Sequence, residues 1–244
     1  MSDARTRMLD LVAVAAPYWA GEAEIAREYL ATRRTPARDL VWLKAQAWKE
    51  TRLLRGLAPE AQRQYFATGR VADHPEGVEA VRKFAEEMKH FRLIAGLVTE
   101  LTGTPVTLDD LTELPEETKL QAMRAPYRFG TPFERAVVNF TEGGGGGIYW
   151  VLARLQGGAT ERRIADVFRE IHDEEVWHGP AEVRSIARQV TDAADWERAA
   201  RIVRDLCRQR LAMRNEMFSL PLAESRLDEI AAGHIEPWPM PIKL

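Results

Sequence analysis

The sequence of 244 residues predicts an all-α fold. Apolar residues recur at spacings of three and four over long segments, as one buried face of a helix requires. Thr-Pro pairs at residues 35–36 and 131–132 are typical helix starts, and the strict alternation expected of strands is nearly absent. The length is sufficient for one large core, so we expect a single domain over residues 1–244.

Composition excludes several classes of function. The chain has 34 basic and 37 acidic residues and a formal charge of -3, so nucleic acid is not an expected partner. Its single cysteine, Cys207, excludes an internal disulfide and any cysteine-rich zinc, iron–sulfur or rubredoxin-type site. The sequence shows no signal peptide pattern and no run of membrane-spanning length. We therefore expect a cytoplasmic protein without a membrane partner.

Prolines divide the first predicted helices. Residues 4–31 have a mixed apolar periodicity that Pro17 interrupts, so two short helices are expected there. Thr35 precedes a further helix that starts at Pro36, where the missing amide hydrogen costs no hydrogen bond. A short helix is expected to follow Pro59.

The helix that starts at Pro36 carries one charged residue in its apolar row. Leu43, Ala47 and Glu50 recur at helical spacing, and Glu50 is the only charged member. The basic residues of this helix lie off the row and are expected to face water: Lys44, Lys49, Arg52 and Arg55. Glu50 is therefore a candidate inward-facing ligand, with Glu22, Glu24 and Glu28 as weaker competitors.

A long helix from about Asp73 to Gly103 contains the motif Glu-Glu-x-x-His at residues 86–90. A glutamate and a histidine three residues apart lie on one helical face, so Glu87 and His90 can reach one metal ion. Glu87 shares its expected inner face with these apolar residues: Val81, Phe84, Met88, Phe91, Ile94, Ala95 and Val98. A connector over residues 104–128, with two short helices at most, is expected to follow.

The second half repeats this arrangement. Thr131, Pro132 and Glu134 form a capping-box signature that opens a helix carrying Glu142. After a run of five glycines, the helix is expected to resume at Ile148 and to stop near Gly157 and Gly158. Thr160 is expected to cap the next helix, which contains a second Glu-Glu-x-x-His motif with Glu175 and His178. Glu174 competes with Glu175 because it lies four residues before the histidine.

The C-terminal residues 191–244 are predicted to add one helix and a tail. Thr191 or Asp192 starts a long helix that reaches about Ser219. The prolines between Pro237 and Pro241 forbid a helix, so the tail is expected to be extended and to wrap around the body of the protein.

The order of these glutamates and histidines resembles the ferritin-like di-iron/di-manganese carboxylate superfamily. The resemblance covers about residues 36–190 and implies a ferritin-like four-helix bundle with additional N- and C-terminal helices. It implies that Glu50 and His90 serve one metal, and that Glu142 and His178 serve the other. It also implies that Glu87 and Glu175 bridge the two metals. The implied cofactor is two Fe ions, with Mn/Mn or Mn/Fe as alternatives.

On this resemblance, the expected function is a non-haem di-iron oxidase or oxygenase. It would activate O₂ and oxidise a small organic substrate, with electrons from a separate donor protein or from the substrate itself. Two alternatives stay open: a di-manganese catalase or a ferroxidase or iron-handling protein, and a metal-free scaffold subunit of an oxygenase complex. The exposed apolar faces expected on the extra helices also predict a homodimer.

Five consecutive glycines follow Glu142: Gly143, Gly144, Gly145, Gly146 and Gly147. One interpretation is a plain break between two short helices. The other is a wall without side chains that leaves room for a substrate one turn from Glu142. Most nearby aromatic residues are expected in the core, and Tyr149 and Trp177 are candidate catalytic residues beside the metals.

Overall fold

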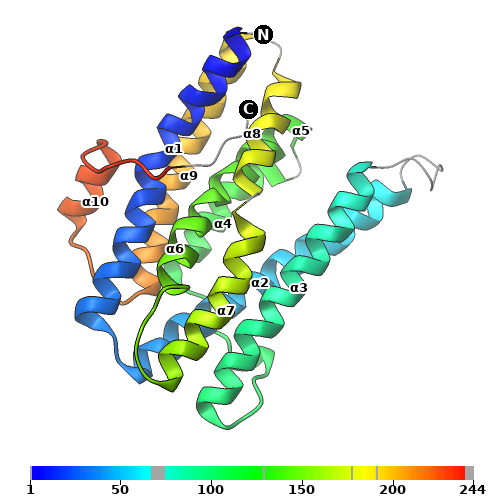
Figure 1. Cartoon of the computed structure of the whole chain (residues 1–244). Helices are drawn as coiled ribbons and strands as arrows, with labels where there is room; N and C mark the ends of the chain where they lie inside the picture. Colours follow the sequence, from blue (N-terminus) through cyan, green and yellow to red (C-terminus); the bar gives the residue numbers. More distant parts are fainter. Residues whose placement is uncertain (1, 67–74, 129, 177, 191, 240–244) are drawn as a thin grey trace. The chain divides into compact units, whose positions relative to one another are not determined.

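The structure is a computed structural model that describes residues 2–66, 75–128, 130–176, 178–190 and 192–239 (Figure 1). Throughout these residues the regular secondary structure is helical, and no strand occurs among them, so the all-α prediction is confirmed. The chain forms two compact units. Unit 1 comprises residues 1–35 and 114–244, and unit 2 comprises residues 36–113. The expectation of a single domain stays a prediction.

Unit 2 is built on a hairpin of two long helices. Helix α2 spans Pro36–Phe66 and packs against α3, which spans Pro75–Thr102. A 3₁₀ turn, η2, follows at Leu108–Asp110. Gly103 ends α3 in the left-handed region, with φ 71°, and its N–H donates to the Thr99 carbonyl, as the helix-stop prediction requires.

Two predicted proline breaks are wrong. Helix α2 continues through Pro59 to Phe66, and α1 is one helix over Ser2–Glu28 with Pro17 inside it. A proline removes one helical hydrogen bond and crowds the preceding turn. Around Pro17, the burial of neighbours such as Ala16 and Trp19 offsets this cost. A π-helical turn, η1 at Tyr29–Arg33, follows α1.

The segment predicted as a connector contains a substantial helix. Helix α4 spans Pro115–Arg128, and α5 spans Pro132–Phe140. The capping box of α5 is confirmed: the Thr131 side chain accepts a hydrogen bond from the Glu134 N–H at 3.2 Å. The Glu134 carboxylate in turn accepts from the Thr131 N–H at 2.8 Å.

We expect the substitution Thr131→Ala to destabilise unit 1 by about 1 kcal/mol, because the first turn of α5 loses its side-chain acceptor. Urea unfolding followed by circular dichroism measures this change. Thr118→Ala is the matched control, because Thr118 is an exposed threonine in the first turns of α4 whose hydroxyl donates to the Leu114 carbonyl instead of capping the helix. Equal losses in the two variants would contradict the capping role.

The glycine run is helical rather than an open break. A 3₁₀ turn, η3, covers Thr141–Gly144, and α6 starts at Gly145 and ends at Leu152, so the helix resumes three residues earlier than predicted. A Cβ at Gly147 would lie 3.0 Å from the Trp19 carbonyl oxygen. This glycine therefore permits the close approach of α6 to α1.

The second Glu-Glu-x-x-His motif does not lie on one helix, contrary to prediction. Helix α7 spans Ala159–Glu175, Val176 forms its C-terminal turn, and α8 spans His178–Gln189. Pro180 explains the end of α7, because it has no N–H for the Val176 carbonyl and its ring crowds that group. The N-cap of α7 is Gly158 and not Thr160.

The C-terminal part follows its prediction with one addition. Helix α9 spans Ala193–Met217, and its N-cap Asp192 accepts from the Asp195 N–H at 3.0 Å. A short helix that was not predicted, α10, spans Glu224–Ala231. In the extended tail, the Trp238 N–H donates to the Ala16 carbonyl at 3.1 Å, so the tail lies against α1 as expected.

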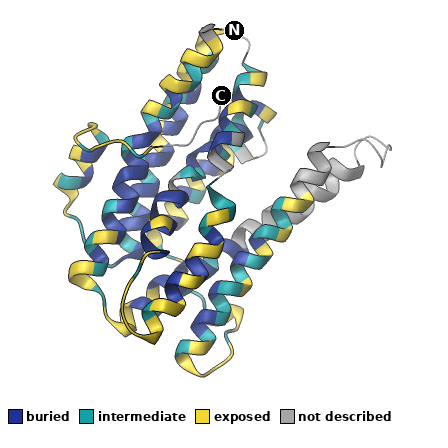
Figure 2. Cartoon of the chain, viewed as in Figure 1, coloured by how far each residue is buried: buried dark blue, intermediate teal, exposed yellow. Residues whose placement is uncertain are grey.

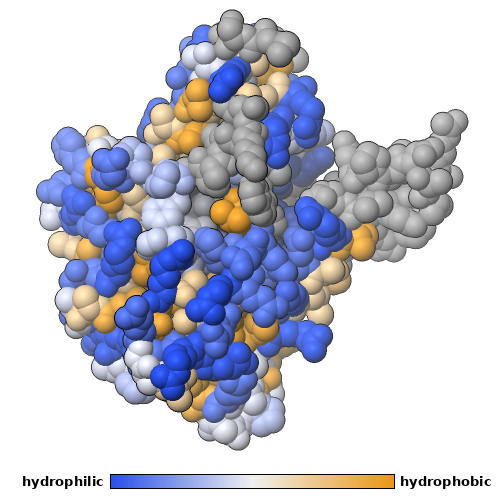
Figure 3. Space-filling view, viewed as in Figure 1, coloured by the Kyte–Doolittle hydropathy of each residue, from blue (hydrophilic) through white to orange (hydrophobic). Residues whose placement is uncertain are grey.

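Within unit 1, α1 contacts α6, α8, α9 and α10, while α4 and α5 pack on α9. Buried residues line the facing sides of these helices (Figure 2). In the view of Figure 3, hydrophilic side chains cover most of the described surface, with hydrophobic ones in small separate patches. No helix in the described part of the chain is long and apolar enough to cross a membrane.

Candidate metal centre

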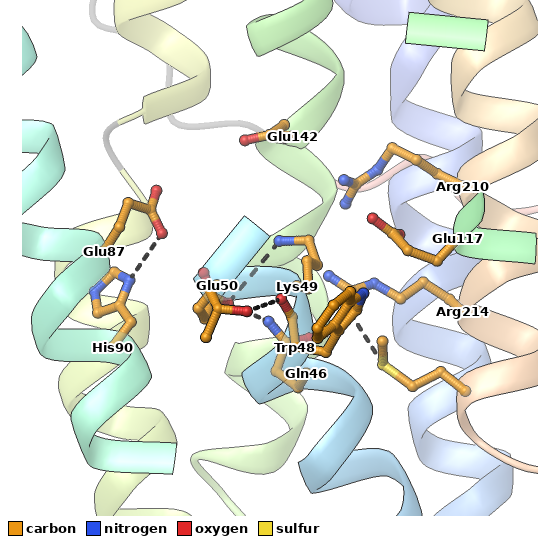
Figure 4. Close-up of polar contacts among 12 residues, drawn as sticks. Gln46, Trp48, Lys49, Glu50, Glu87, His90, Glu117, Glu142, Arg210 and Arg214 are labelled. Carbon is orange, nitrogen blue, oxygen red and sulfur yellow. Dashed lines mark hydrogen bonds and ion pairs between the residues drawn. The ribbon is translucent and has the colours of Figure 1, made fainter. Parts of the chain in front are cut away.

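Three of the predicted ligands meet inside unit 2. Glu50 comes from α2, and Glu87 and His90 come from adjacent turns of α3. One ligand atom of each lies within 4.8 Å of the other two. Each of the three residues is at most 2% exposed. Because α2 packs on α3, Glu50 and the Glu87–His90 pair, which are far apart in the sequence, form one buried set of donor atoms (Figure 4).

Neighbouring side chains orient Glu50. The Gln46 amide, one turn earlier on α2, donates a short hydrogen bond to Glu50 Oε1. Lys49 Nζ lies 4.0 Å from the same oxygen. On α3, His90 Nδ1 lies 3.7 Å from Glu87 Oε2, which is longer than a hydrogen bond (Figure 4).

The burial of these groups has an electrostatic cost. The pKa of Glu50 rises from 4.5 to about 7, mainly because burial disfavours the charged carboxylate; Lys49 and His90 lower this pKa, and the nearby Glu87 carboxylate raises it. The Glu87 Oε2 atom is buried and receives no hydrogen bond from the described residues. Two carboxylates held together away from water are therefore only partly compensated by the surrounding side chains.

Some expectations about the faces of α2 and α3 are wrong. Lys49 was expected to face water, but it is 5% exposed and contacts Glu50. On α3, Val81 and Met88 are exposed at 49% and 37%, whereas Ile94 and Val98 are buried as expected. The buried face of α3 is therefore centred on Glu87, His90 and Ile94 rather than on Val81 and Met88. The side chains of Arg52 and Arg55 lie outside the description.

The predicted ligand Glu142 has a different partner in the structure. It lies in η3, and its Oε1 accepts a hydrogen bond from Arg124 Nη1 of α4 at 2.9 Å. Arg124 is 2% exposed and also donates to the Thr141 hydroxyl at 3.2 Å. This buried arginine was not singled out from the sequence. Its partnership gives Glu142 a role inside unit 1 that requires no metal.

The second Glu-x-x-His pair is described only in part. Glu175 is the last residue of α7 and is half-buried. His178 begins α8, and its side chain lies outside the described residues, as does Trp177. The roles of Glu142, Glu175 and His178 as ligands of a second metal stay predictions.

Two of the glutamates that were alternatives to Glu50 as a ligand form ion pairs with arginines. Glu22 of α1 is fully buried and accepts from Arg210 Nε and Nη2 of α9, each at 3.0 Å. Arg214 Nε of α9 lies 3.3 Å from the same carboxylate. Glu24 accepts from Arg226 at 2.7 and 2.8 Å on the part-exposed side. The four-residue spacing of Arg210 and Arg214 within an apolar row was the available sequence signal.

The predicted pocket residues have mixed surroundings. A Cβ at Gly145 would lie 3.1 Å from the Tyr149 ring, and one at Gly147 would meet the main chain of Trp19, so these glycines serve packing. A Cβ at Gly146 would meet no atom within 4 Å. Tyr149 is buried and stacks on Phe168 with ring centroids 5.7 Å apart. Its catalytic role stays a prediction.

Comparison with known proteins gives one informative likeness. No protein-family model matches the chain, and no curated protein is significantly similar to it. A solved structure of a TenA homolog from Pseudomonas syringae pv. tomato str. DC3000 has a TM-score of 0.65 to this chain, with 14% sequence identity. The match covers 87% of this chain and 92% of that protein.

This likeness corrects the family assignment. The solved neighbour is a TenA homolog, so the identification as a ferritin-like di-iron/di-manganese protein is wrong. The di-iron oxidase or oxygenase prediction rested on that family and is wrong with it, as are the oxidoreductase class and the alternatives of catalase, ferroxidase and oxygenase scaffold. What the comparison shows is the fold: the chain has an all-helical fold like that of a TenA homolog.

Proposed function

We propose that unit 2 binds one divalent first-row transition-metal ion through Glu50, Glu87 and His90. The observation that carries this proposal is the convergence of three buried donor atoms within 4.8 Å of one another. Metal bonds to carboxylate oxygen and imidazole nitrogen are about 2.0–2.2 Å long, so two ligands of one ion lie up to about 4.4 Å apart. Small side-chain rotations therefore suffice to bring the donors to bonding distance.

The donor set favours iron(II) or manganese(II). Two carboxylates and one imidazole, without a thiolate, suit these ions better than copper. The cation would balance the two carboxylates and give the buried Glu87 Oε2 a ligand in place of a hydrogen-bond donor. The Gln46 amide supports such a site because it fixes the rotamer of the Glu50 carboxylate.

The competing explanation is a buried ion pair without metal. Lys49 brings one positive charge to within 4.0 Å of Glu50. One lysine balances one of the two carboxylates, and balancing Glu87 without a metal requires a protonated His90, whose Nδ1 lies 3.7 Å from Glu87 Oε2. The metal explanation accounts for both carboxylates and for the histidine.

The proposal is tested by metal titration. Protein stripped with EDTA is titrated with Mn²⁺ in a calorimeter, and Fe²⁺ is tested anaerobically. We expect tight binding at this site and at least a tenfold weaker affinity in Glu87→Gln, because a charged ligand is lost. Glu86→Gln is the matched control: Glu86 precedes Glu87 and pairs with exposed Arg82 at 3.5 Å. Wild-type affinity in Glu87→Gln, or equal loss in Glu86→Gln, would refute the site.

A further inference from the structure

Lys49 brings a third charged group to the metal centre of unit 2. It precedes Glu50 on α2, and its side chain is 6% exposed. The Lys49 position lies off the apolar row that contains Glu50, so the side chain reaches the carboxylate by bending back toward it (Figure 4). Its Nζ lies 4.0 Å from Glu50 Oε1, which makes an ion pair but not a hydrogen bond. Charge rather than a directed bond therefore holds Lys49 at Glu50.

The Lys49 ammonium and the proposed metal ion neutralise the same carboxylates. Without metal, Lys49 supplies one positive charge beside Glu50 and Glu87, and it lowers the pKa of Glu50 against the larger effect of burial. A divalent ion by itself balances both carboxylates, since a ligating histidine is neutral. With the ion bound, the ammonium is therefore a surplus positive charge beside ligands that are at most 2% exposed. Surplus charge away from water is unfavourable.

The distance between Lys49 and Glu50 determines how strongly the two cations compete. A metal–carboxylate bond is about 2.1 Å long, so an ion bound through Glu50 Oε1 lies at most about 6 Å from the present position of Nζ. Repulsion scales with the product of the charges divided by the distance. The ammonium therefore repels the doubly charged ion about a third more strongly than it repels a proton on the same oxygen, 4.0 Å away. Removal of the ammonium thus favours the metal even over protonation of Glu50.

We infer that Lys49 is a tethered counter-ion that competes with the metal for Glu50 and leaves this carboxylate when the metal binds. The inference rests on the proposed metal site and adds a means of regulating it. A lysine side chain has a flexible four-carbon stem, and the Lys49 position off the apolar row allows the ammonium to turn away from Glu50. Lys49 raises the metal concentration at which the site fills, and it returns to Glu50 when the ion dissociates.

Calorimetric titration of Lys49→Met with Mn²⁺ tests the competition. Methionine fills a similar volume without charge, so this variant should bind Mn²⁺ at least about tenfold more tightly than the wild type at pH 8, for an effective dielectric constant of about 20. Lys49→Arg keeps the charge and should gain no affinity. Lys44→Met is the matched control, because Lys44 is a half-buried lysine of the same helix whose charge acts on Asp110. It should bind Mn²⁺ as the wild type does.

Chemical labelling of the wild-type protein follows the movement of Lys49 without any substitution. Lysine amines are reductively methylated for short times, and mass spectrometry gives the rate at each lysine. Lys49 should be methylated slowly in EDTA and several times faster with saturating Mn²⁺, because its amine leaves a buried ion pair. The rate at Lys44 should not change. A lysine that only fills space would show the same rate in both conditions.

The metal site and the competition fail in different ways. If the wild type binds Mn²⁺ and a folded Lys49→Met binds it equally or more weakly, the competition is refuted while the metal site stands. If neither protein binds Mn²⁺, both proposals are refuted. Circular dichroism verifies folding, and the labelling of the wild type decides if Lys49→Met does not fold. An unchanged rate at Lys49 with saturating Mn²⁺ would also overturn the inference.

Discussion

Replacement of Glu22 by glutamine is expected to lower the free energy of unfolding by about 3–5 kcal/mol, the loss typical when one partner of a buried ion pair is removed. Glu22 is fully buried and is the shared acceptor of Arg210 and Arg214, which are also fully buried. Glutamine keeps the size of the side chain but carries no charge. Two buried guanidinium groups would then lose the carboxylate that they share, and neither can lose its proton.

Glu24→Gln is the matched control for this loss. Glu24 pairs with Arg226 of the part-exposed surface, where side-chain exposures are 26% and 31%. Such a pair contributes at most about 1 kcal/mol. Thermal unfolding compares the two variants, and a loss of 3–5 kcal/mol corresponds to a Tm about 6–20 °C lower in a chain of this size. Equal Tm values for the two variants would show that the buried network is not a main source of stability.

The sequence predicted the existence of helices better than their ends. Apolar periodicity and the Thr131 capping box are local signals, and both are confirmed. The break expected at Pro17 is wrong because packing against other helices, which no local pattern records, offsets the loss of one hydrogen bond. The break expected at Pro59 is also wrong, since α2 continues to Phe66. In contrast, Pro180 does coincide with a helix end, since α7 stops at Glu175 and α8 starts at His178.

For the candidate site too, the features set by local sequence patterns were predicted and those set by tertiary packing were not. The spacing of Glu87 and His90, and the isolated charge of Glu50 in an apolar row, were sufficient to find three donors that converge. The contacts of Gln46 and Lys49 with Glu50, and of Arg124 with Glu142, were not predicted. Each contact depends on a side-chain rotamer or on which helices pack together, and the sequence pattern records neither. The family assignment failed for a related reason: a helical period gives the buried face of each helix but not the connections between helices.

The metal-free protein should lose stability as the pH rises from 5 to 8. Burial raises the pKa of Glu50 to about 7, whereas an unfolded glutamate has a pKa near 4.5. The unfolded state therefore releases this proton first, so the contribution is fully present below pH 4.5 and is lost as the pH passes through 7. The two pKa values correspond to a loss of about 3 kcal/mol.

Glu50→Gln isolates this effect, because glutamine resembles the protonated carboxyl and does not titrate. Urea unfolding in EDTA at pH 5 and pH 8 gives the change for each protein. The wild type should lose about 2.5 kcal/mol more than the variant over this interval, because a small part of the loss already occurs below pH 5. Added Mn²⁺ should restore about 2.7 kcal/mol to the wild type at pH 8 when its concentration is a hundred times Kd, because the ion binds only the folded, ionised site. Parallel losses in the two proteins would mean that Glu50 is already ionised in the folded state at pH 5. An equal effect of Mn²⁺ on the variant would place the ion at other ligands.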